Sequence, residues 1–228
     1  MKAMILAAGR GERMQPLTLT TPKPLLTIDN KPLIVYHIEN LAAAGFKELV
    51  INVSYLGDQI VNALGNGEKW NVHINYSIED EPQEVAGGIC RALPLLGDEP
   101  FLTINADIWT DYPLANLKNY PVENAHLVLA PAPSYYPQGD FSLQNQTLIP
   151  VKIGNELIVT GVTVYHPRFF SHIKPGIQRM GTLWHQAVAR GELTGECYNG
   201  KWHDIGTPER FYQINTQIQL LNQQPLNI

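Results

Sequence analysis

The feature of this sequence that most restricts its fold is a regular alternation of short apolar runs with segments of helical spacing across the first two-thirds of the chain. The expected strands are 2–6, 49–53, 73–76 and 101–105, and the expected helices are 32–44, 57–64 and 87–95. Strands that alternate with helices form mainly parallel sheets, because parallel strands need crossover connections. The pattern therefore predicts an α/β fold with ligands at the carboxyl ends of the strands.

The character of the sequence changes after about Asp111, where prolines separate short β-like stretches at 126–130 and 157–165. We expect a small antiparallel part that covers the site, a last helix over 208–221 and a loose tail over 222–228. With 228 residues, the chain is long enough for one well-buried core and too short for two full domains. We therefore expect one domain that spans 1–228.

Charge and cysteine content exclude several kinds of partner. The formal net charge is -5, so no overall positive field attracts a nucleic acid or an anionic membrane. Cys90 and Cys197 are the only cysteines and have no metal-binding spacing, which favours two structural thiols in a reduced, cytoplasmic protein. The apolar run at 1–8 is too short for a signal peptide core or a membrane span, and is better explained as a buried strand.

The most informative motif begins where the first strand ends. The sequence reads G-x-G-x-R at 9–13, P-L-T at 16–18 and P-K-P-L at 22–25. Glycines in such a loop let backbone N–H groups approach a polyphosphate, and Arg13 and Lys23 can neutralise it. The spacing matches neither G-x-G-x-x-G nor G-x-x-x-x-G-K-[ST], and a short G-x-G alone is equally compatible with a plain turn. The complete string, however, arises rarely by chance.

Two aspartates are candidates for a Mg²⁺ site. Asp107 follows the apolar strand 101–105, and Asp204 ends a short strand just before Thr207-Pro208, which has the sequence of a helix N-cap with Pro at N1. Nucleotidyl transfer depends on positioning and charge neutralisation, usually by Mg²⁺ on oxygen ligands. Taken alone, each aspartate is more often a turn or cap residue. Together with the phosphate loop they favour a metal site.

These motifs resemble those of the nucleotide-diphospho-sugar pyrophosphorylases, the sugar-1-phosphate nucleotidyltransferase family, which has a Rossmann-like, GT-A-like fold. The resemblance implies that the phosphates of an NTP bind at Ala8, Gly9, Gly11, Glu12, Arg13 and Lys23. Arg13 would stabilise the departing pyrophosphate, Lys23 the α-phosphate, and Asp107 and Asp204 would hold Mg²⁺. The sequence departs mildly from the family at 105–107, which reads Asn-Ala-Asp instead of Asn-Gly-Asp.

The same resemblance suggests contacts to the base and the sugar. Glu81 and the backbone around Gly87 are the candidates for the base, although an acidic loop before a helix explains Glu81 about equally well. The candidates for the sugar are Asn105, Asp140, Glu156 and Thr160. Asp140 follows a glycine and is also typical of a turn.

The sequence reads W-T-D-Y at 109–112, G-D-F at 139–141 and W-H-D-I-G-T-P-E-R at 202–210. With these motifs, nearly the whole chain resembles the uridylyltransferases that act on N-acetylmuramate 1-phosphate in peptidoglycan recycling. This similarity implies UTP and that sugar 1-phosphate as substrates, with UDP-N-acetylmuramate and pyrophosphate as products. The absence of the extensions found in larger relatives suggests a monomer. The alternatives are a mannose-1-phosphate guanylyltransferase, a glucose-1-phosphate thymidylyltransferase or a non-catalytic nucleotide-sugar-binding regulator. The presence of Arg13, Lys23, Asp107 and Asp204 counts against the regulator.

Overall fold

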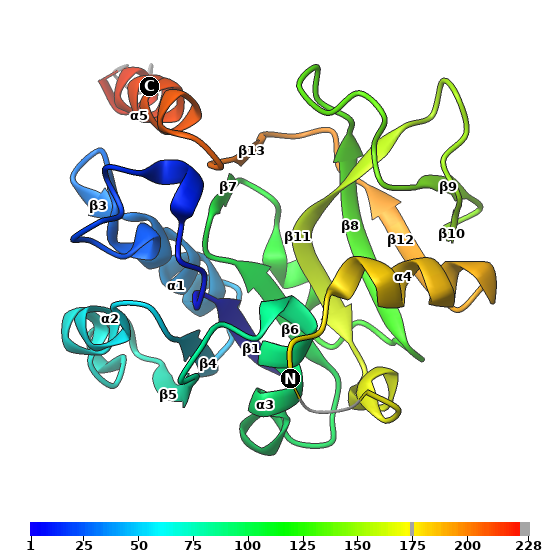
Figure 1. Ribbon diagram of the computed structural model, residues 1–228, viewed down its shortest axis with the longest axis horizontal. Coiled ribbons are helices and arrows are strands. Elements are labelled where there is room, and N and C mark those ends of the chain that lie inside the picture. Colours follow the sequence, from blue (N-terminus) through cyan, green and yellow to red (C-terminus); the bar gives the residue numbers. More distant parts are fainter. Residues whose placement is uncertain (174–175, 224–228) are drawn as a thin grey trace.

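The computed structural model of the protein describes residues 1–173 and 176–223. Its main feature is a nine-stranded sheet with helices on both faces (Figure 1). From one edge to the other the sheet contains β5 (His73–Ile78), β4 (Glu48–Val53), β1 (Lys2–Leu6), β6 (Phe101–Asn105), β11 (Leu157–Tyr165), β8 (Ala125–Pro131), β12 (Leu193–Cys197), β10 (Thr147–Ile149) and β9 (Ser142–Gln144).

Most strands of this sheet run in one direction. The strands β1, β4, β5 and β6 are mutually parallel, and β12 is parallel with β8, whereas β11 is antiparallel to both β6 and β8. The chain builds outward from β1 to β4 and β5, and then returns to place β6 on the other side of β1. A reversal of this kind leaves a crevice at the carboxyl ends of the strands, where open α/β sheets bind ligands.

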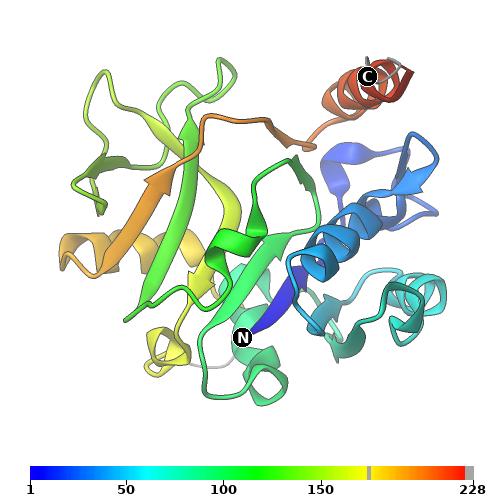
Figure 2. The ribbon, with the colours of Figure 1, turned by 180° about the vertical axis from the view of Figure 1, so that it is seen from behind.

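The helices cover the two faces of the sheet. On one face α1 (Leu33–Ala43) and α2 (Gly57–Leu64) pack on the odd-numbered residues of β1, and on the other α3 (Glu84–Leu96) and α4 (Met180–Ala189) share a core with Met4. Figure 1 shows α4 in front of β8 and β12, and in the reverse view of Figure 2 these strands lie in front of it. The covered sheet explains why β1, β4 and β6 are mostly apolar.

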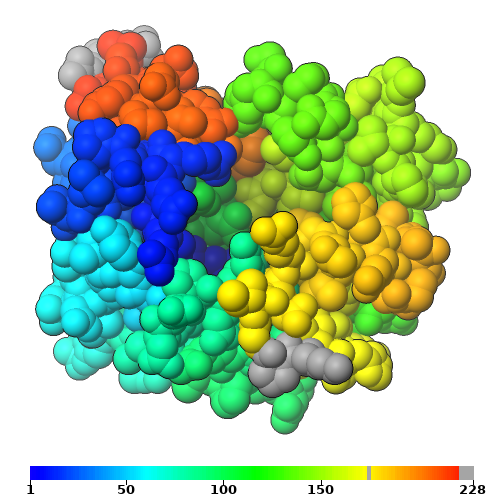
Figure 3. Space-filling model, viewed as in Figure 1, coloured from blue at the N-terminus to red at the C-terminus, as the bar shows by residue number. Residues whose placement is uncertain are grey.

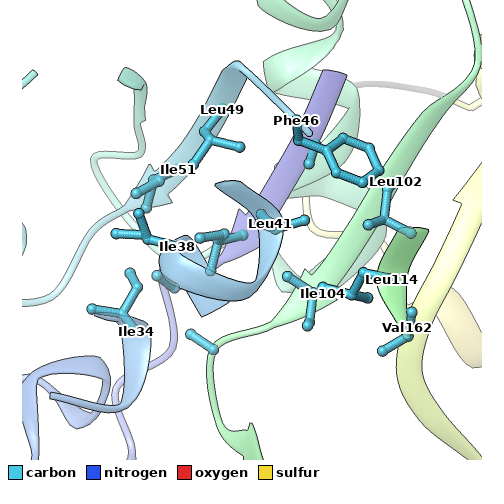
Figure 4. Packing of buried hydrophobic residues seen from close by; sticks show 14 of the residues in the cluster. Ile34, Ile38, Leu41, Phe46, Leu49, Ile51, Leu102, Ile104, Leu114 and Val162 are labelled. Atoms are coloured by element: carbon cyan, nitrogen blue, oxygen red, sulfur yellow. The ribbon is translucent and has the colours of Figure 1, made fainter. Parts of the chain in front are cut away.

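The core under α1 follows helical spacing. Ile34, Ile38 and Leu41 are fully buried and meet Leu49 and Ile104 from the sheet (Figure 4). Positions i, i+4 and i+7 lie on one side of a helix, and burying each such side chain stabilises the fold by about 1.5–3 kcal/mol. This packing fixes β1 and β6, whose ends carry the site.

A third cluster joins the two ends of the chain. The last helix, α5 (Pro208–Gln223), places Phe211, Ile214 and Ile218 against Met14 and Ile28. The backbone N–H of Asp29 also donates to Asn215 Oδ1 at 2.8 Å. The loop that follows β1 is therefore held by the C-terminal helix.

The α/β fold predicted from the sequence is confirmed, with differences in detail. The strands expected to form a separate antiparallel part continue the central sheet, while the short pairs β2 (Thr27–Ile28) with β3 (Lys31–Pro32) and β7 (Ile108–Thr110) with β13 (Trp202–Asp204) stand apart. Neither α4 nor β12 was predicted from the sequence. The last helix reaches Gln223, so the predicted loose tail lies largely at 224–228, outside the described residues.

The predicted start of the third helix, at Gly87, was three residues late. α3 begins at Glu84, whose φ is +60°. A left-handed backbone is unusual for a non-glycine residue, so nothing in helix propensity marks this position. Among the described residues, no helix combines the length and apolar character that a membrane span needs.

Candidate active site

A cleft of about 640 Å³ opens at the carboxyl ends of β1 and β6. The space-filling view shows the hollow at the centre of this face (Figure 3). Its walls are the loop after β1 (residues 7–14, the phosphate loop), the turn at 79–83 together with the first residues of α3, and the segment 105–107 at the end of β6. The cleft therefore lies where the order of strands predicts a ligand.

The phosphate loop owes its shape to glycine. Gly11 has a φ of +64°, and a Cβ there would lie 3.0 Å from Thr18 Cγ2, so a larger residue would be both strained and crowded. The Thr18 hydroxyl donates to Gly11 O at 2.8 Å and closes the loop. The 3₁₀ turn η1 (Glu12–Met14) then buries Met14 and leaves Arg13 exposed to the cleft.

Lys23 is a buried lysine that reaches the cleft. It begins the 3₁₀ turn η2 (Lys23–Leu25) between Pro22 and Pro24, and it is 7% exposed. The prolines restrict the backbone on both sides. Its Nζ lies 2.8 Å from Asp107 Oδ2, so a fixed positive charge stands beside a carboxylate at the base of the cleft.

Asp107 and Asp204 are brought together by the two-stranded ribbon of β7 and β13. Asp204 is paired with Ile108 across the ribbon, and Ile205 N–H donates to Asp107 O at 2.9 Å. Burial raises the pKa of Asp204, and the charge of Asp107 raises it further, against the opposing effect of nearby cations, of which Arg210 is the strongest. Arg210 Nη1 lies 3.2 Å from Asp204 Oδ2.

The two carboxylates fit a Mg²⁺ ion better than a metal held entirely by protein. Within 1–173 and 176–223, no three His, Cys, Asp or Glu side chains gather closely enough to hold a metal. Mg²⁺ usually takes one or two carboxylates together with water and substrate phosphates. Burial and the charge of Asp107 raise the pKa of Asp204, and a divalent cation held by the two carboxylates would favour its ionised form.

A second cleft, of about 960 Å³, adjoins the first and shares Arg13, Asn105 and Glu84 with it. Gly161 has a φ of +88°, and a Cβ there would lie 2.7 Å from Asn105 Nδ2, so glycine makes room for the Asn105 side chain. Asp140 accepts hydrogen bonds from Val159 N–H at 2.8 Å and from the Tyr136 hydroxyl at 3.2 Å. The remaining lining includes Tyr135, Trp184, Arg179, Arg210 and Asp204.

The structure places most, but not all, of the predicted residues at these clefts. The first cleft is lined by Ala8, Gly9, Gly11, Glu12, Arg13, Lys23, Glu81, Asn105 and Asp107, and the second by Arg13, Asn105, Asp140 and Asp204. Gly87, Glu156 and Thr160 do not line the described parts of either cleft. Thr160 is buried and donates to Val128 O at 2.7 Å, and Glu156 Oε1 accepts from Gly154 N–H at 2.9 Å.

Several lining residues were not predicted from the sequence. They are Asn52, Glu79, Gln83, Glu84, Tyr135, Arg179 and Arg210. Asn52 could have been predicted from the sequence, because it is a polar residue near the carboxyl end of an apolar strand. The others come from turns or helix ends and show no distinctive spacing.

A buried histidine lies beneath the ribbon of β7 and β13. His37, on α1, is 2% exposed, and neither ring nitrogen has a hydrogen-bond partner of normal geometry among the described residues. Burial lowers its pKa to about 4; the nearby Ile108 backbone and the charge of Asp107 oppose this shift only in part. The neutral imidazole is therefore the form that fits the core.

This histidine makes stability depend on pH. The unfolded chain takes up a proton on His37 below about pH 6.5, whereas the folded protein does so only near pH 4. Stability is therefore complete above pH 6.5 and falls by about 1.4 kcal/mol per pH unit as the pH drops toward 4. We expect His37→Leu to remove this part of the slope in urea unfolding measured from pH 7 to pH 4.

The exposed His172 provides the matched control. His172→Asn should keep the wild-type slope. A His37→Leu protein whose stability falls with pH as steeply as that of the wild type would contradict the assignment.

Comparison with known proteins identifies the family of the chain. Residues 2–135 match the family model described as nucleotidyl transferase. The chain is 44% identical to the N-acetylmuramate alpha-1-phosphate uridylyltransferase of Neisseria meningitidis serogroup B, over 91% of this chain and 94% of the relative. It is 33% identical to the mannose-1-phosphate guanyltransferase of Schizosaccharomyces pombe over 92% of this chain, which spans only 62% of that relative.

Solved structures share the fold. A candidate glucose-1-phosphate thymidylyltransferase from Bacillus anthracis, crystallised with sucrose, superposes with a TM-score of 0.84 at 24% identity and covers 100% of this chain and 98% of its own. HddC from Yersinia pseudotuberculosis gives a TM-score of 0.80 at 19% identity, with 95% of this chain and 99% of its own covered. The sequence matches show that the chain, whose phosphate loop, Lys23 and Asp107 line one cleft, belongs to the nucleotidyl transferase family, as a sugar-1-phosphate nucleotidyltransferase.

Proposed function

We propose that the protein transfers UMP from UTP to N-acetylmuramate 1-phosphate, giving UDP-N-acetylmuramate and pyrophosphate. The observation that carries the proposal is the pair of adjoining clefts, with Arg13 and Asn105 lining both and Asp107 and Asp204 near their junction. One cleft offers backbone amides and cations to a triphosphate, and the other offers arginines and aromatic rings to a sugar. The identity to the Neisseria uridylyltransferase supports the choice of substrates.

The chemistry under this proposal is a direct displacement. An oxygen of the sugar phosphate attacks the α-phosphorus of UTP, and the bond to the β-phosphate breaks as pyrophosphate leaves. Asp107 and Asp204 would hold Mg²⁺, which neutralises the reacting phosphates when bound. Lys23 stabilises the charge that develops on the α-phosphate, and Arg13 that on pyrophosphate. No side chain needs to act as a nucleophile.

The second cleft has arginines that can bind the acidic groups of an acceptor. Arg13, Arg179 and Arg210 line it, and the Arg210 guanidinium also lies 4.3 Å from the centre of the Tyr135 ring. Glu84, Asp140 and Asp204 line the same cleft, so an acidic sugar 1-phosphate would be held by individual arginines and not by an overall positive charge. The roles of Asp140, Glu156 and Thr160 in sugar binding, and of Glu81 and Gly87 in base binding, remain predictions.

The proposal also covers the pathway, the compartment and the oligomeric state. We place it in peptidoglycan recycling in the cytoplasm, with one chain as the working unit and no nucleic acid or membrane partner. Size-exclusion chromatography with light scattering tests the monomer directly.

Pyrophosphate release with Mg²⁺ tests the substrates. We expect turnover for UTP with N-acetylmuramate 1-phosphate, and far less when UTP is replaced by dTTP, GTP, CTP or ATP. The acceptor series is N-acetylglucosamine, glucose and mannose 1-phosphates. Turnover with GTP and mannose 1-phosphate, or with dTTP and glucose 1-phosphate, would replace the proposed substrates within the same family. A folded protein inactive with every pair would instead favour a regulatory role.

A further inference from the structure

A buried polar pair, Asn52 and Glu79, lies beneath the first cleft and has no part in the proposed chemistry. Asn52 is near the end of β4 and Glu79 directly follows β5, and they are 4% and 3% exposed. Both line the first cleft and neither lines the described part of the second. Burying a polar amide and a carboxylate is costly unless both are fully engaged.

Three hydrogen bonds link the two walls of the cleft through this pair: one within the pair and one from the pair to each wall. Ala7 N–H, at the start of the phosphate loop, donates to Asn52 Oδ1 at 2.8 Å. Asn52 Nδ2 donates to Glu79 Oε1 at 2.7 Å, and Gln83 N–H donates to Glu79 Oε2 at 2.9 Å. A continuous chain of bonds therefore joins the phosphate loop to the turn that faces it.

The first turns of α3 hold the pair in place. A Cβ on Gly88 would lie 2.7 Å from Glu79 Oε1 and 2.8 Å from Asn52 Nδ2. Only a glycine lets the helix approach this closely. The side chains consequently have little room to adopt another arrangement.

We infer that Asn52 and Glu79 are positioning residues that set the separation of the phosphate loop from the Gln83 turn, and thereby the affinity for the NTP. This inference rests on the use of an NTP in the proposed function. The pair lines the first cleft and not the described part of the second. Its loss should therefore weaken the binding of the NTP and leave the binding of the sugar phosphate unchanged. Loss of a residue needed only for folding would not weaken the binding of one substrate and spare that of the other.

Exchanging the amide at position 52 with the carboxylate at position 79 tests the inference. Glu79→Gln puts an amide where both neighbours donate, so one hydrogen bond is lost in either orientation of the amide. Asn52→Asp places two carboxylates face to face. The double variant restores the pattern: its amide at position 79 can donate to the carboxylate at position 52 and accept from Gln83 N–H, while that carboxylate accepts from Ala7 N–H.

We expect each single variant to raise the KM for UTP, and the Kd for UTP measured without acceptor, by about tenfold. The KM for the sugar 1-phosphate should change by less than about twofold, and the double variant should recover most of the loss. Gly88→Ala provides an independent variant, because it pushes a methyl group against the pair without altering a charge. Ser77→Ala, beside Asn52 in the neighbouring strand, is the control for a buried polar change outside the cleft.

The outcomes are distinguishable once thermal melts show which variants fold. Wild-type UTP affinity in folded variants, equal losses for both substrates, or a double variant no better than the singles would overturn the inference. If the single variants do not fold, the Gly88→Ala and double variants test the inference by the same comparison of UTP affinity with the KM for the sugar 1-phosphate. A wild type that binds UTP but uses no acceptor would refute only the proposed function, whereas a wild type that binds no nucleotide would refute both.

Discussion

Replacing Asp107 or Asp204 with Asn should lower Mg²⁺-dependent turnover by roughly a hundredfold to a thousandfold, the effect of removing one group that stabilises a reacting phosphate or oxyanion. Asparagine keeps the shape of the side chain and removes its charge. Asp204 ends β13, and Asp107 directly precedes β7, the strand paired with β13. Pyrophosphate release over a range of Mg²⁺ concentrations should show that more metal restores little activity.

The control for this prediction is Asp58→Asn, an exposed carboxylate on α2. It should have wild-type kinetics, and all three variants should show cooperative thermal unfolding. Near-normal turnover in folded Asp107→Asn or Asp204→Asn protein would refute the metal assignment.

Replacing Lys23 with Ala should lower kcat by about a hundredfold or more and change the KM for UTP by only a few fold. Lys23 is buried and held by two prolines, with Nζ 2.8 Å from Asp107. Such a fixed charge contributes most when negative charge is redistributed at the α-phosphate, and least when the nucleotide first binds. Steady-state kinetics with varied UTP separates the two effects.

The matched control is Lys31→Ala. Lys31 pairs with Glu39 at 2.6 Å on the surface and lines neither cleft in the described part of the chain, so its loss should alter neither constant. Equal losses in kcat and in UTP affinity for Lys23→Ala would identify Lys23 as a simple binding residue.

The parts of the site that the sequence predicted are those encoded by local patterns. The phosphate loop follows a strand and has its own glycine spacing, so Gly11, Arg13 and Lys23 could be located without a structure. Asp107 closely follows the end of β6, where an open sheet binds ligands, and Asp204 ends a short strand just before a helix N-cap sequence. The fold class followed from the alternation of strands and helices for the same reason.

Other parts of the site depend on contacts between distant segments. Asn52 and Glu79 meet only because β4 and β5 are adjacent and in a particular register, and Arg179 and Arg210 arrive from helix ends. Thr160, which the family resemblance suggested as a sugar contact, lies beside a local irregularity of β11. The pairing of β11 with β8 shifts register between Val159 and Thr163, so regular alternation cannot say which side chains face the cleft.

The ribbon of β7 and β13 has a consequence for how the protein is made. Its two strands are far apart in the chain: the Thr110 hydroxyl donates to Lys201 O across 91 positions of sequence. During synthesis the early strands and the phosphate loop leave the ribosome first, while one of the two carboxylates is still untranslated. The site is therefore complete only after the C-terminal strand and helix, which also hold the loop after β1, have docked onto the part that emerged first.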